Sequence, residues 1–241
     1  MTKNLPNNGF FIKINIAFLL LKQGKLSSIL YAIKVRFYSS KNSIGLVKDL
    51  SKDYEYPKPK IEYSIRLFEE ADINKLQENF RHIGFIKQKI PYCYTALTKN
   101  NIPCYRMWIM KSNENERIKS YFKGIFPKLK EDEALIEGVF THPDYRGLKI
   151  MPNIIGDISK KIKQEGINKI IVFVDKRNIA SLKGFKQSGF NPYISRKTKW
   201  RFFIRTISFE PIPKLLIEEY IRKTYTEISS MTINKDGVNY F

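Results

Sequence analysis

The chain has 241 residues, of which 43% are apolar, with only 12 Gly and 11 Pro, a composition typical of a globular protein and not of a disordered one. Its 43 Lys and Arg against 23 Asp and Glu give a net charge of +20, which favours anionic partners. With two Cys and two His, the sequence gives no support for a metal site or a disulfide framework.

Residues 1–48 are a basic segment with eight Lys or Arg and no Asp or Glu. Apolar residues recur at helical spacing within residues 10–21 and 26–37, which predicts two amphipathic helices. The first apolar run is too short to span a bilayer. Three interpretations stay open: a helical extension packed on the main domain or on a second subunit of a homodimer, a peripheral membrane contact through residues 10–38, and an organelle transit peptide.

Residues 49–60 contain two prolines and predict a linker. The main domain begins after it, because residues 61–66 alternate between polar and apolar side chains like a strand and residues 69–76 begin a helix. Two further strands, at residues 92–97 and 104–110, flank a turn that contains two asparagines. This pattern predicts an antiparallel hairpin.

Residues 111–132 form a long connection that is charged at its start and aromatic further on. Long loops in compact domains are often functional, so one interpretation is a segment that covers a substrate site. The other interpretation is a mobile excursion on the surface.

A strand–loop–helix–strand unit follows. An apolar strand at residues 134–142 leads into the loop 143–149 and a helix at about residues 150–164. A second apolar strand, at residues 169–174, is followed by a short helix that ends near Gly189. Parallel strands need a crossover of a dozen or more residues, and the intervening helix supplies one, so these two strands are predicted to be parallel.

The loop 143–149 is the chemical centre of this unit. Backbone N–H groups at the start of a helix, together with the helix dipole, favour a bound phosphate. Gly147 allows close approach of the backbone, and Arg146 and Lys149 add charge-assisted contacts. The loop has neither the Walker lysine-serine ending nor the G-x-G-x-x-G dinucleotide pattern. It therefore predicts either a site for a phosphate-bearing ligand or a solvated basic turn.

The C-terminal part contains two further predicted elements. Residues 198–207 alternate like a final strand, and residues 214–225 have the spacing of an amphipathic helix. The last dozen residues are expected to be frayed.

Two motifs in the central unit resemble those of the GNAT superfamily of acetyl-CoA-dependent N-acetyltransferases. They are Val139-Phe-Thr-His-Pro-x-Tyr-Arg-Gly147 and Asn178-x-x-Ser-x-x-x-Phe-x-x-x-Gly-Phe190, and the resemblance covers roughly residues 61–207. It implies an α/β fold with a mixed central sheet, a V-shaped parallel strand pair and flanking helices, to which the N-terminal amphipathic helices are added. The predicted domain is then residues 61–210, followed by a C-terminal helix and tail at residues 211–241.

The resemblance also implies a binding site for acetyl-CoA as the acyl donor. The loop would bind the pyrophosphate, the backbone at the end of the preceding strand would hold the thioester carbonyl, and the second motif would lie beside the pantetheine arm. The residues expected to contact acetyl-CoA are Phe140, Thr141, Arg146, Gly147, Leu148, Lys149, Ile150, Asn178, Ser181 and Phe185. Asn178 is also expected to cap the helix that follows it.

The sequence departs from the family pattern at three positions. Lys149 and Met151 stand where the family has small residues, and a bulky side chain at Lys149 conflicts with the usual backbone geometry, although its ammonium can meet a phosphate. Phe185 stands where many members have a tyrosine that protonates the leaving thiolate. Phenylalanine cannot donate a proton, so that step falls to water or to another group.

Two carboxylates are candidates for the base that takes a proton from the amine. Glu137 is the first, because some GNAT enzymes place a glutamate base on this strand and alternation puts it on the same face as Val139. The ordinary alternative is a partly buried Glu paired with a cation. Asp175, at the end of the next strand, is the weaker candidate.

We therefore expect a cytoplasmic N-acetyltransferase, free or peripheral to the membrane, that transfers an acetyl group to an amine. By analogy alone, the favoured acceptor is an amino sugar of a surface-polysaccharide pathway, with a peptide or small-metabolite amine nearly equal. One alternative is an inactive GNAT-fold binding module that uses its basic face on a membrane or RNA, and another is an enzyme with a different acyl donor. Nucleic acid is not an expected partner, because the aromatics are not interleaved with Arg on one strand face.

Overall fold

The computed structural model describes residues 26–76, 85 and 90–225. The chain divides into two compact units, each described here by itself. Unit 1 comprises Met1–Lys41 and Lys197–Ser208, and unit 2 comprises Asn42–Arg196 and Phe209–Phe241.

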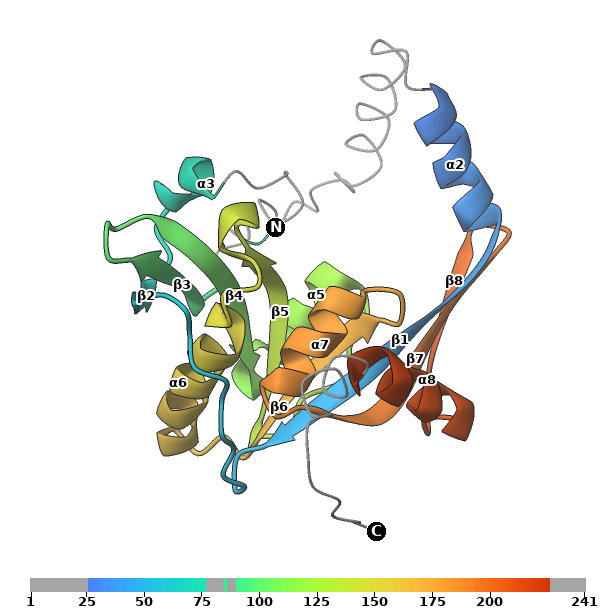
Figure 1. The fold of residues 1–241 in the computed structure, drawn as a ribbon. Coiled ribbons are helices and arrows are strands. Elements are labelled where there is room, and N and C mark those ends of the chain that lie inside the picture. Colours follow the sequence, from blue (N-terminus) through green and yellow to red (C-terminus); the bar gives the residue numbers. More distant parts are fainter. Residues whose placement is uncertain (1–25, 77–84, 86–89, 226–241) are drawn as a thin grey trace, which may run out of the picture. The chain divides into compact units, whose positions relative to one another are not determined.

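The described residues form helices and a mixed β-sheet (Figure 1). The helices are α2 (Leu26–Phe37), α3 (Asp72–Lys75), α5 (Asn115–Phe122), α6 (Ile150–Gln164), α7 (Ile179–Gln187) and α8 (Lys214–Tyr225), with short 3-10 helices η2 (Ser112–Glu114) and η3 (Pro143–Tyr145). The strands are β1 (Tyr38–Asp49), β2 (Tyr63–Leu67), β3 (Cys93–Thr98), β4 (Pro103–Lys111), β5 (Glu133–Thr141), β6 (Lys169–Asp175), β7 (Asn191–Arg201) and β8 (Ile204–Glu210).

The sheet has the strand order β2-β3-β4-β5-β6-β1-β7-β8. β5 and β6 are parallel, whereas β2 with β3, β3 with β4, β4 with β5 and β1 with β6 are antiparallel. The predicted α/β class, the parallel pair and the β3–β4 hairpin are therefore confirmed.

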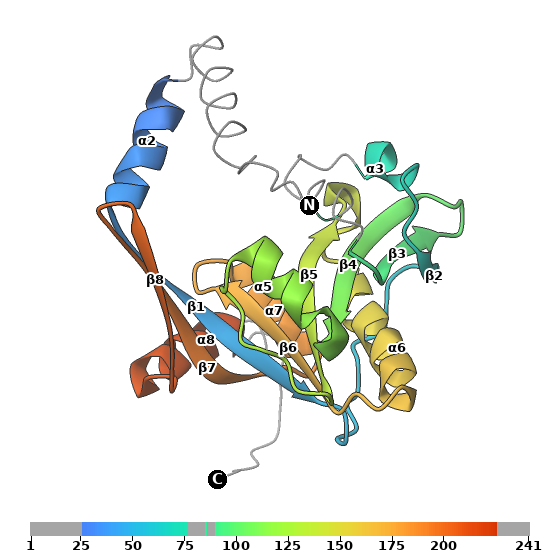
Figure 2. The same ribbon diagram turned by 180° about the vertical axis from the view of Figure 1, so that it is seen from behind.

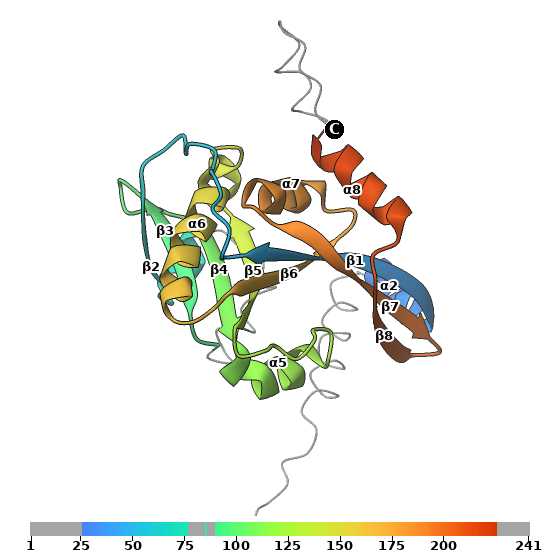
Figure 3. The ribbon, with the colours of Figure 1, turned by 90° about the horizontal axis from the view of Figure 1, so that it is seen from below.

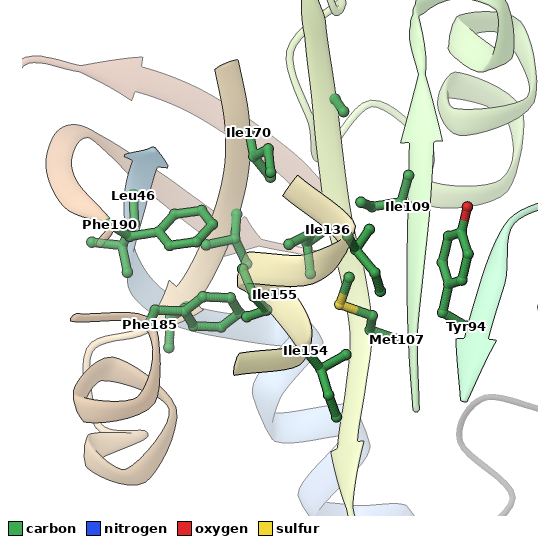
Figure 4. Close-up of a cluster of buried hydrophobic side chains, with 14 of the residues drawn as sticks. Leu46, Tyr94, Met107, Ile109, Ile136, Ile154, Ile155, Ile170, Phe185 and Phe190 are labelled. Carbon is green, nitrogen blue, oxygen red and sulfur yellow. The ribbon is translucent and has the colours of Figure 1, made fainter. Parts of the chain in front are cut away.

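Unit 2 has helices on both faces of its sheet. Figures 2 and 3 show α5 on the face opposite to α6 and α7. α6 is amphipathic, and its isoleucines at three- and four-residue spacing are buried against the sheet. The main core lies on this side, and Figure 4 labels ten of its residues: Leu46, Tyr94, Met107, Ile109, Ile136, Ile154, Ile155, Ile170, Phe185 and Phe190.

A second core lies on the other side of the sheet and takes in the connection at residues 111–132. Phe122 and Phe126 pack edge to face with a centroid distance of 4.8 Å, and Phe126 contacts Phe173 of β6. The side-chain amide of Asn115 binds Leu129 through both its oxygen and its nitrogen. The connection is thus packed against the sheet, and the expectation of a mobile surface excursion is wrong.

The N-terminal segment differs from the prediction after residue 37. The helix predicted at residues 26–37 is present as α2, whereas the one at residues 10–21 lies outside the described residues. From Tyr38 the chain forms β1, where a helical extension up to residue 48 was predicted. The spacing of the buried residues changes here from helical to alternating. Ile44 and Leu46 enter the main core, whereas Val47 packs against the second core.

The predicted linker is a packed segment. Residues 50–62 contain neither helix nor strand. Tyr56, however, lies so close to Gly156 of α6 that a Cβ there would come within 2.8 Å of its ring, and Tyr54 lies equally close to Gly189. The segment is therefore fixed against α6 and the end of α7.

The C-terminal part also departs from the prediction in one element. The strand predicted at residues 198–207 is a hairpin instead, because the chain turns at Phe202 and Phe203 between β7 and β8. Both residues have positive φ, and no Gly or Asn marks the turn in the sequence. The helix predicted at residues 214–225 is present as α8.

Candidate active site

The two parallel strands separate at the centre of unit 2. β5 and β6 pair only from Glu133–Leu135 to Lys169–Ile171. Beyond this point β5 remains paired with β4, and β6 with β1. Among the described residues, the edge of β5 that faces β6 therefore has no strand partner from Ile136 onward, and its backbone groups are available to a ligand.

A β-bulge lies on β5 just after this separation. Trp108 of β4 pairs with Glu137, and Arg106 pairs with Phe140, so Gly138 and Val139 together oppose a single residue. Gly138 has a φ of 63°, and a Cβ there would lie 2.7 Å from the Trp108 ring. Only glycine fits this position without strain.

The bulge corrects one prediction about Glu137. The extra residue interrupts the alternation of side chains along β5. Glu137 pairs with Trp108, a member of the second core, whereas Val139 packs against the main core. The two side chains therefore lie on opposite faces of the sheet, contrary to the prediction.

The loop after β5 has the backbone geometry of an anion site. Gly147 has a φ of 77° and Lys149 a φ of 60°. In the part of the chain that the structure describes, no hydrogen bond uses the N–H groups of Gly147, Leu148 or Lys149. Successive free N–H groups with left-handed residues among them form a concavity that suits an anion. The sequence predicted that the Lys149 side chain conflicts with the usual backbone geometry. Lys149 nevertheless adopts a left-handed conformation, which costs about 1–2 kcal/mol.

The charged side chains of the loop are held in place. Arg146 is exposed, and its Nε donates to the carbonyl of Thr141 at 3.2 Å. The Lys149 ammonium donates to Oε1 of Gln187 at 3.3 Å. His142, in contrast, is buried, and its Nδ1 accepts the Asp144 N–H at 3.3 Å. The two cations thus stand beside the free N–H groups.

The segment before β2 clamps the loop from outside. The Lys60 N–H donates to the carbonyl of Leu148 at 2.9 Å. Asn153, on the first turns of α6, donates through Nδ2 to the carbonyls of Pro57 and Lys149, each at 2.7 Å. Sequence reasoning missed Asn153, because nothing in the local sequence indicates that its partner lies some hundred residues away.

The second motif is placed partly as predicted. The Asn178 Oδ1 accepts the Ser181 N–H at 3.2 Å and caps α7, which confirms the predicted cap. Phe185 is buried in the main core and packs edge-on against Phe190. Ile150 is buried there too, so the side chains of Phe185 and Ile150 contribute to the core. Contacts between these residues and acetyl-CoA stay a prediction.

The two candidate bases differ in their surroundings. Asp175 binds the side chain of Arg177 through both oxygens, at 3.0 and 2.9 Å. Glu137 is half-buried on the second-core face, beside the bulge. Arg106, which sequence reasoning missed, is buried close by, with its guanidinium 4.1 Å from the centroid of the Trp108 ring. The assignment of the base to Glu137 or Asp175 stays a prediction.

Lys48 on β1 is a buried cation beside the end of α7. Its Nζ donates to the Tyr56 hydroxyl and, at 2.8 Å, to the carbonyl of Ser188. Burial lowers the pKa of Lys48 from its usual 10.5 to about 8. Sequence reasoning placed Lys48 at the end of a helical extension and missed this role.

A hollow of about 380 Å³ adjoins the loop on the side of the β3–β4 turn. Two isoleucines and a tyrosine give it an apolar floor, and an exposed Glu62–Lys99 pair lies at its rim. Its lining residues are Ile61, Glu62, Thr98, Lys99, Asn100, Ile102 and Tyr145. Tyr145 is the only one of them that comes from the loop after β5.

Comparisons with known proteins agree with this geometry. Residues 106–190 match the sequence model of the Acetyltransferase (GNAT) family, a span from β4 to the end of the second motif. No curated protein matches the sequence significantly.

Three solved structures are similar to this chain. A GCN5-related glucosamine N-acetyltransferase region of a fungal multi-domain GH3 β-N-acetylglucosaminidase is 18% identical, covers 73% of this chain and 23% of that chain, and has a TM-score of 0.50. A GCN5-related N-acetyltransferase from Sphaerobacter thermophilus is 10% identical with coverages of 73% and 57% and a TM-score of 0.46. A GNAT-family acetyltransferase from Colwellia psychrerythraea is 15% identical with coverages of 72% and 57% and a TM-score of 0.45. The match spans less than two thirds of each of these proteins.

The sequence match covers the separating strands, the loop and the helix α7, and it coincides with the part of the fold that forms the candidate site. Residues 106–190 are therefore similar in sequence to the acetyltransferase (GNAT) family, and the chain shares the fold of a GCN5-related N-acetyltransferase region.

Proposed function

We propose that the protein is an N-acetyltransferase that moves the acetyl group of acetyl-CoA directly to an amine. The observation that carries the proposal is the opening between β5 and β6, which ends in a loop with free N–H groups and two cations. An extended thioester with a pyrophosphate at one end fits such an opening, because exposed strand edges bind amide groups and N–H concavities bind phosphate.

The residues of this chain fit acetyl-CoA, which would supply an activated acyl group. The N–H groups of Gly147, Leu148 and Lys149, with the side chain of Arg146, would hold the pyrophosphate. The backbone of Phe140 and Thr141, at the end of β5, would lie beside the thioester. A backbone N–H there would stabilise negative charge on the carbonyl oxygen.

Glu137 would act as the base. The attacking nitrogen forms a bond to the acetyl carbon while the carbon–sulfur bond breaks, and one proton must leave the nitrogen. A half-buried carboxylate on β5, beside the bulge, can accept that proton directly or through water. The thiolate takes its proton from water, because Phe185 cannot donate one.

The acceptor would reach the thioester from the second-core face, where Glu137 lies. An amino sugar is the first acceptor to test, and the glucosamine N-acetyltransferase region among the structural neighbours supports only the fold of such an enzyme. The amine of a peptide or small metabolite is the second class to test.

The proposal is tested by thiol release from acetyl-CoA with a panel of amines that includes glucosamine and a short peptide. We expect one class of amine to be acetylated, with Glu137→Gln lowering kcat about 10²- to 10⁴-fold and leaving acetyl-CoA binding intact. Glu116→Gln, an exposed carboxylate on α5, is the matched control and should keep full activity. Equal activity of the Glu137→Gln variant across the pH range would exclude Glu137 as the base.

A further inference from the structure

An exposed apolar stripe runs along α2 in unit 1. Leu26, Leu30, Ile33 and Phe37 are all about half exposed. At about 100° per residue they fall within a sector of about 60° on one side of the helix. Lys34 and Arg36 lie on the two flanks of this stripe, each about 80° from it.

The β7–β8 turn adds two phenylalanines to this stripe. The N–H groups of Phe202 and Phe203 donate to the carbonyls of Phe37 and Arg36, at 2.8 and 3.0 Å. The Phe37 and Phe202 rings meet edge to face at 5.1 Å. The turn thus joins the end of α2, and the stripe with Phe202 and Phe203 forms one surface, which we call the apolar patch.

The turn holds its phenylalanines in an unfavourable backbone. Phe202 and Phe203 have φ values of 47° and 66°, which a two-residue hairpin turn normally gives to Asn and Gly. Their side chains remain 68% and 55% exposed, so little burial within this chain offsets the strain. A strained backbone whose side chains add little to the stability of the fold indicates a role in binding.

The charge around the patch has one sign. The described parts of unit 1, residues 26–41 and 197–208, contain seven Lys and Arg and no Asp or Glu. An apolar surface surrounded by cations complements a partner that is anionic at its surface and apolar just beneath it.

We propose that the apolar patch docks on an anionic lipid bilayer. The leucines, isoleucine and phenylalanines would enter the region between headgroups and acyl chains, while Lys34 and Arg36 would reach the headgroup phosphates from the flanks of the helix. Within the described residues, no helix is long and apolar enough to span a bilayer. This contact is independent of the acetyl-CoA site.

Two other partners fit the patch less well. Nucleic acid would satisfy the cations but leaves the exposed leucines and isoleucine without a role, because backbone recognition is electrostatic and stacking uses aromatic rings. A second copy of the patch would bring seven cations against seven, which opposes association.

The test is co-sedimentation of the full chain with vesicles of phosphatidylcholine alone or mixed with phosphatidylglycerol. We expect binding to the mixed vesicles only, weakened by salt. The double variant F202N/F203G should bind about tenfold or more weakly, because two aromatic side chains are lost. Its thermal stability should not fall, because Asn-Gly suits this turn.

Two further variants make the result specific. L30S/I33S removes part of the stripe from the helix and should also weaken binding, without touching the turn. L215S/I221S removes exposed apolar side chains of α8 in unit 2 and should bind like the wild type.

Several results would overturn the proposal. Equal binding to both kinds of vesicle would show that the charge of the lipid does not contribute. Unchanged binding of folded F202N/F203G and L30S/I33S would show that the apolar patch is not the contact surface. Binding of oligouridine RNA that is lost in F202N/F203G, in place of vesicle binding, would identify nucleic acid as the partner. Dimers of the wild type that the same variant abolishes would identify a second copy.

Discussion

Lys48 illustrates how a single residue links the N-terminal strand to the candidate site. It is buried and donates to Tyr56 of the packed segment and to Ser188 at the end of α7. A cation at the C-terminal end of a helix interacts favourably with the helix dipole. Desolvation opposes this gain, and it is the cause of the lowered pKa.

The lowered pKa of Lys48 predicts a pH dependence of stability. Between pH 8 and 10.5 the unfolded state holds the Lys48 proton more tightly than the folded state does. The free energy of unfolding should therefore rise with pH across this window, by up to about 3 kcal/mol from this group. The measurement is urea denaturation of the wild type and Lys48→Met at several pH values. The variant should lack this rise, and parallel curves for the two proteins would contradict the prediction.

The sequence reveals some site residues and not others, for a physical reason. Asn178 was predicted as a cap because a cap bonds to the next turn of its own helix. Arg146 and Gly147 were singled out because loop chemistry is also local. Asn153 and Arg106 act on groups far away in the sequence, and local patterns carry no information about such partners.

Among the elements, β5 gives the site its shape. Its bulge at Gly138 comes just after the last pair with β6 and redirects the strand. The lone glycine in this apolar strand is compatible with a bulge and also with regular pairing, so the sequence alone does not decide between the two. The face of Glu137 was therefore predicted wrongly, although the strand itself was predicted correctly.

Gly138→Ala should destabilise unit 2 through this bulge. Its Cβ would lie 2.7 Å from the Trp108 ring and 3.0 Å from the Phe85 ring in a left-handed backbone. We expect a loss of about 2–4 kcal/mol in the free energy of unfolding, from strain and overpacking together. Denaturant unfolding measures this loss.

Gly166→Ala is the matched control. Gly166 has a φ of +87° but nothing within 4 Å of its Cβ position, so only the backbone strain of about 1 kcal/mol remains. Equal losses in the two variants would show that the contact with Trp108 is unimportant.

The strand β1 makes the N-terminal segment part of the sheet. It lies between β6 and β7, and Leu46 is fully buried there. Leu46→Ala should lower the free energy of unfolding by about 2–5 kcal/mol, the range for a buried leucine. Leu26→Ala on α2, where the leucine is half exposed, should change it by less than about 0.5 kcal/mol. Chemical denaturation of both variants tests this, and a neutral Leu46→Ala would show that β1 does not belong to the folded core.

The long, strongly periodic elements were the predictable ones. α6 and α8 follow the helical spacing, and the β3–β4 hairpin follows alternation around its turn. β1 was missed because its short alternating stretch follows directly on a helix. The β7–β8 turn was missed because it uses phenylalanines in place of the usual Asn and Gly. Pairing of β1 with a strand more than a hundred residues later depends on tertiary structure alone.

In the whole molecule, the two units differ in the residues they carry. The separated strands, the free N–H groups and the candidate base all lie in unit 2, whereas the described part of unit 1 holds only basic and uncharged residues. The two motifs that resemble the GNAT family both lie in unit 2, so the sequence pointed to the part of the chain that holds the candidate site. The domain boundaries at residues 48, 60 and 210 stay a prediction.

Calorimetric titration of acetyl-CoA into the full chain shows whether the loop after β5 binds the pyrophosphate. We expect binding by the wild type and by Arg222→Ala, which removes an exposed arginine of α8. Arg146→Ala should bind about 1.5–3 kcal/mol more weakly while remaining folded, the range for a charge-assisted hydrogen bond. Absence of binding by the folded wild type, or equal affinity of folded Arg146→Ala, would contradict binding at this loop.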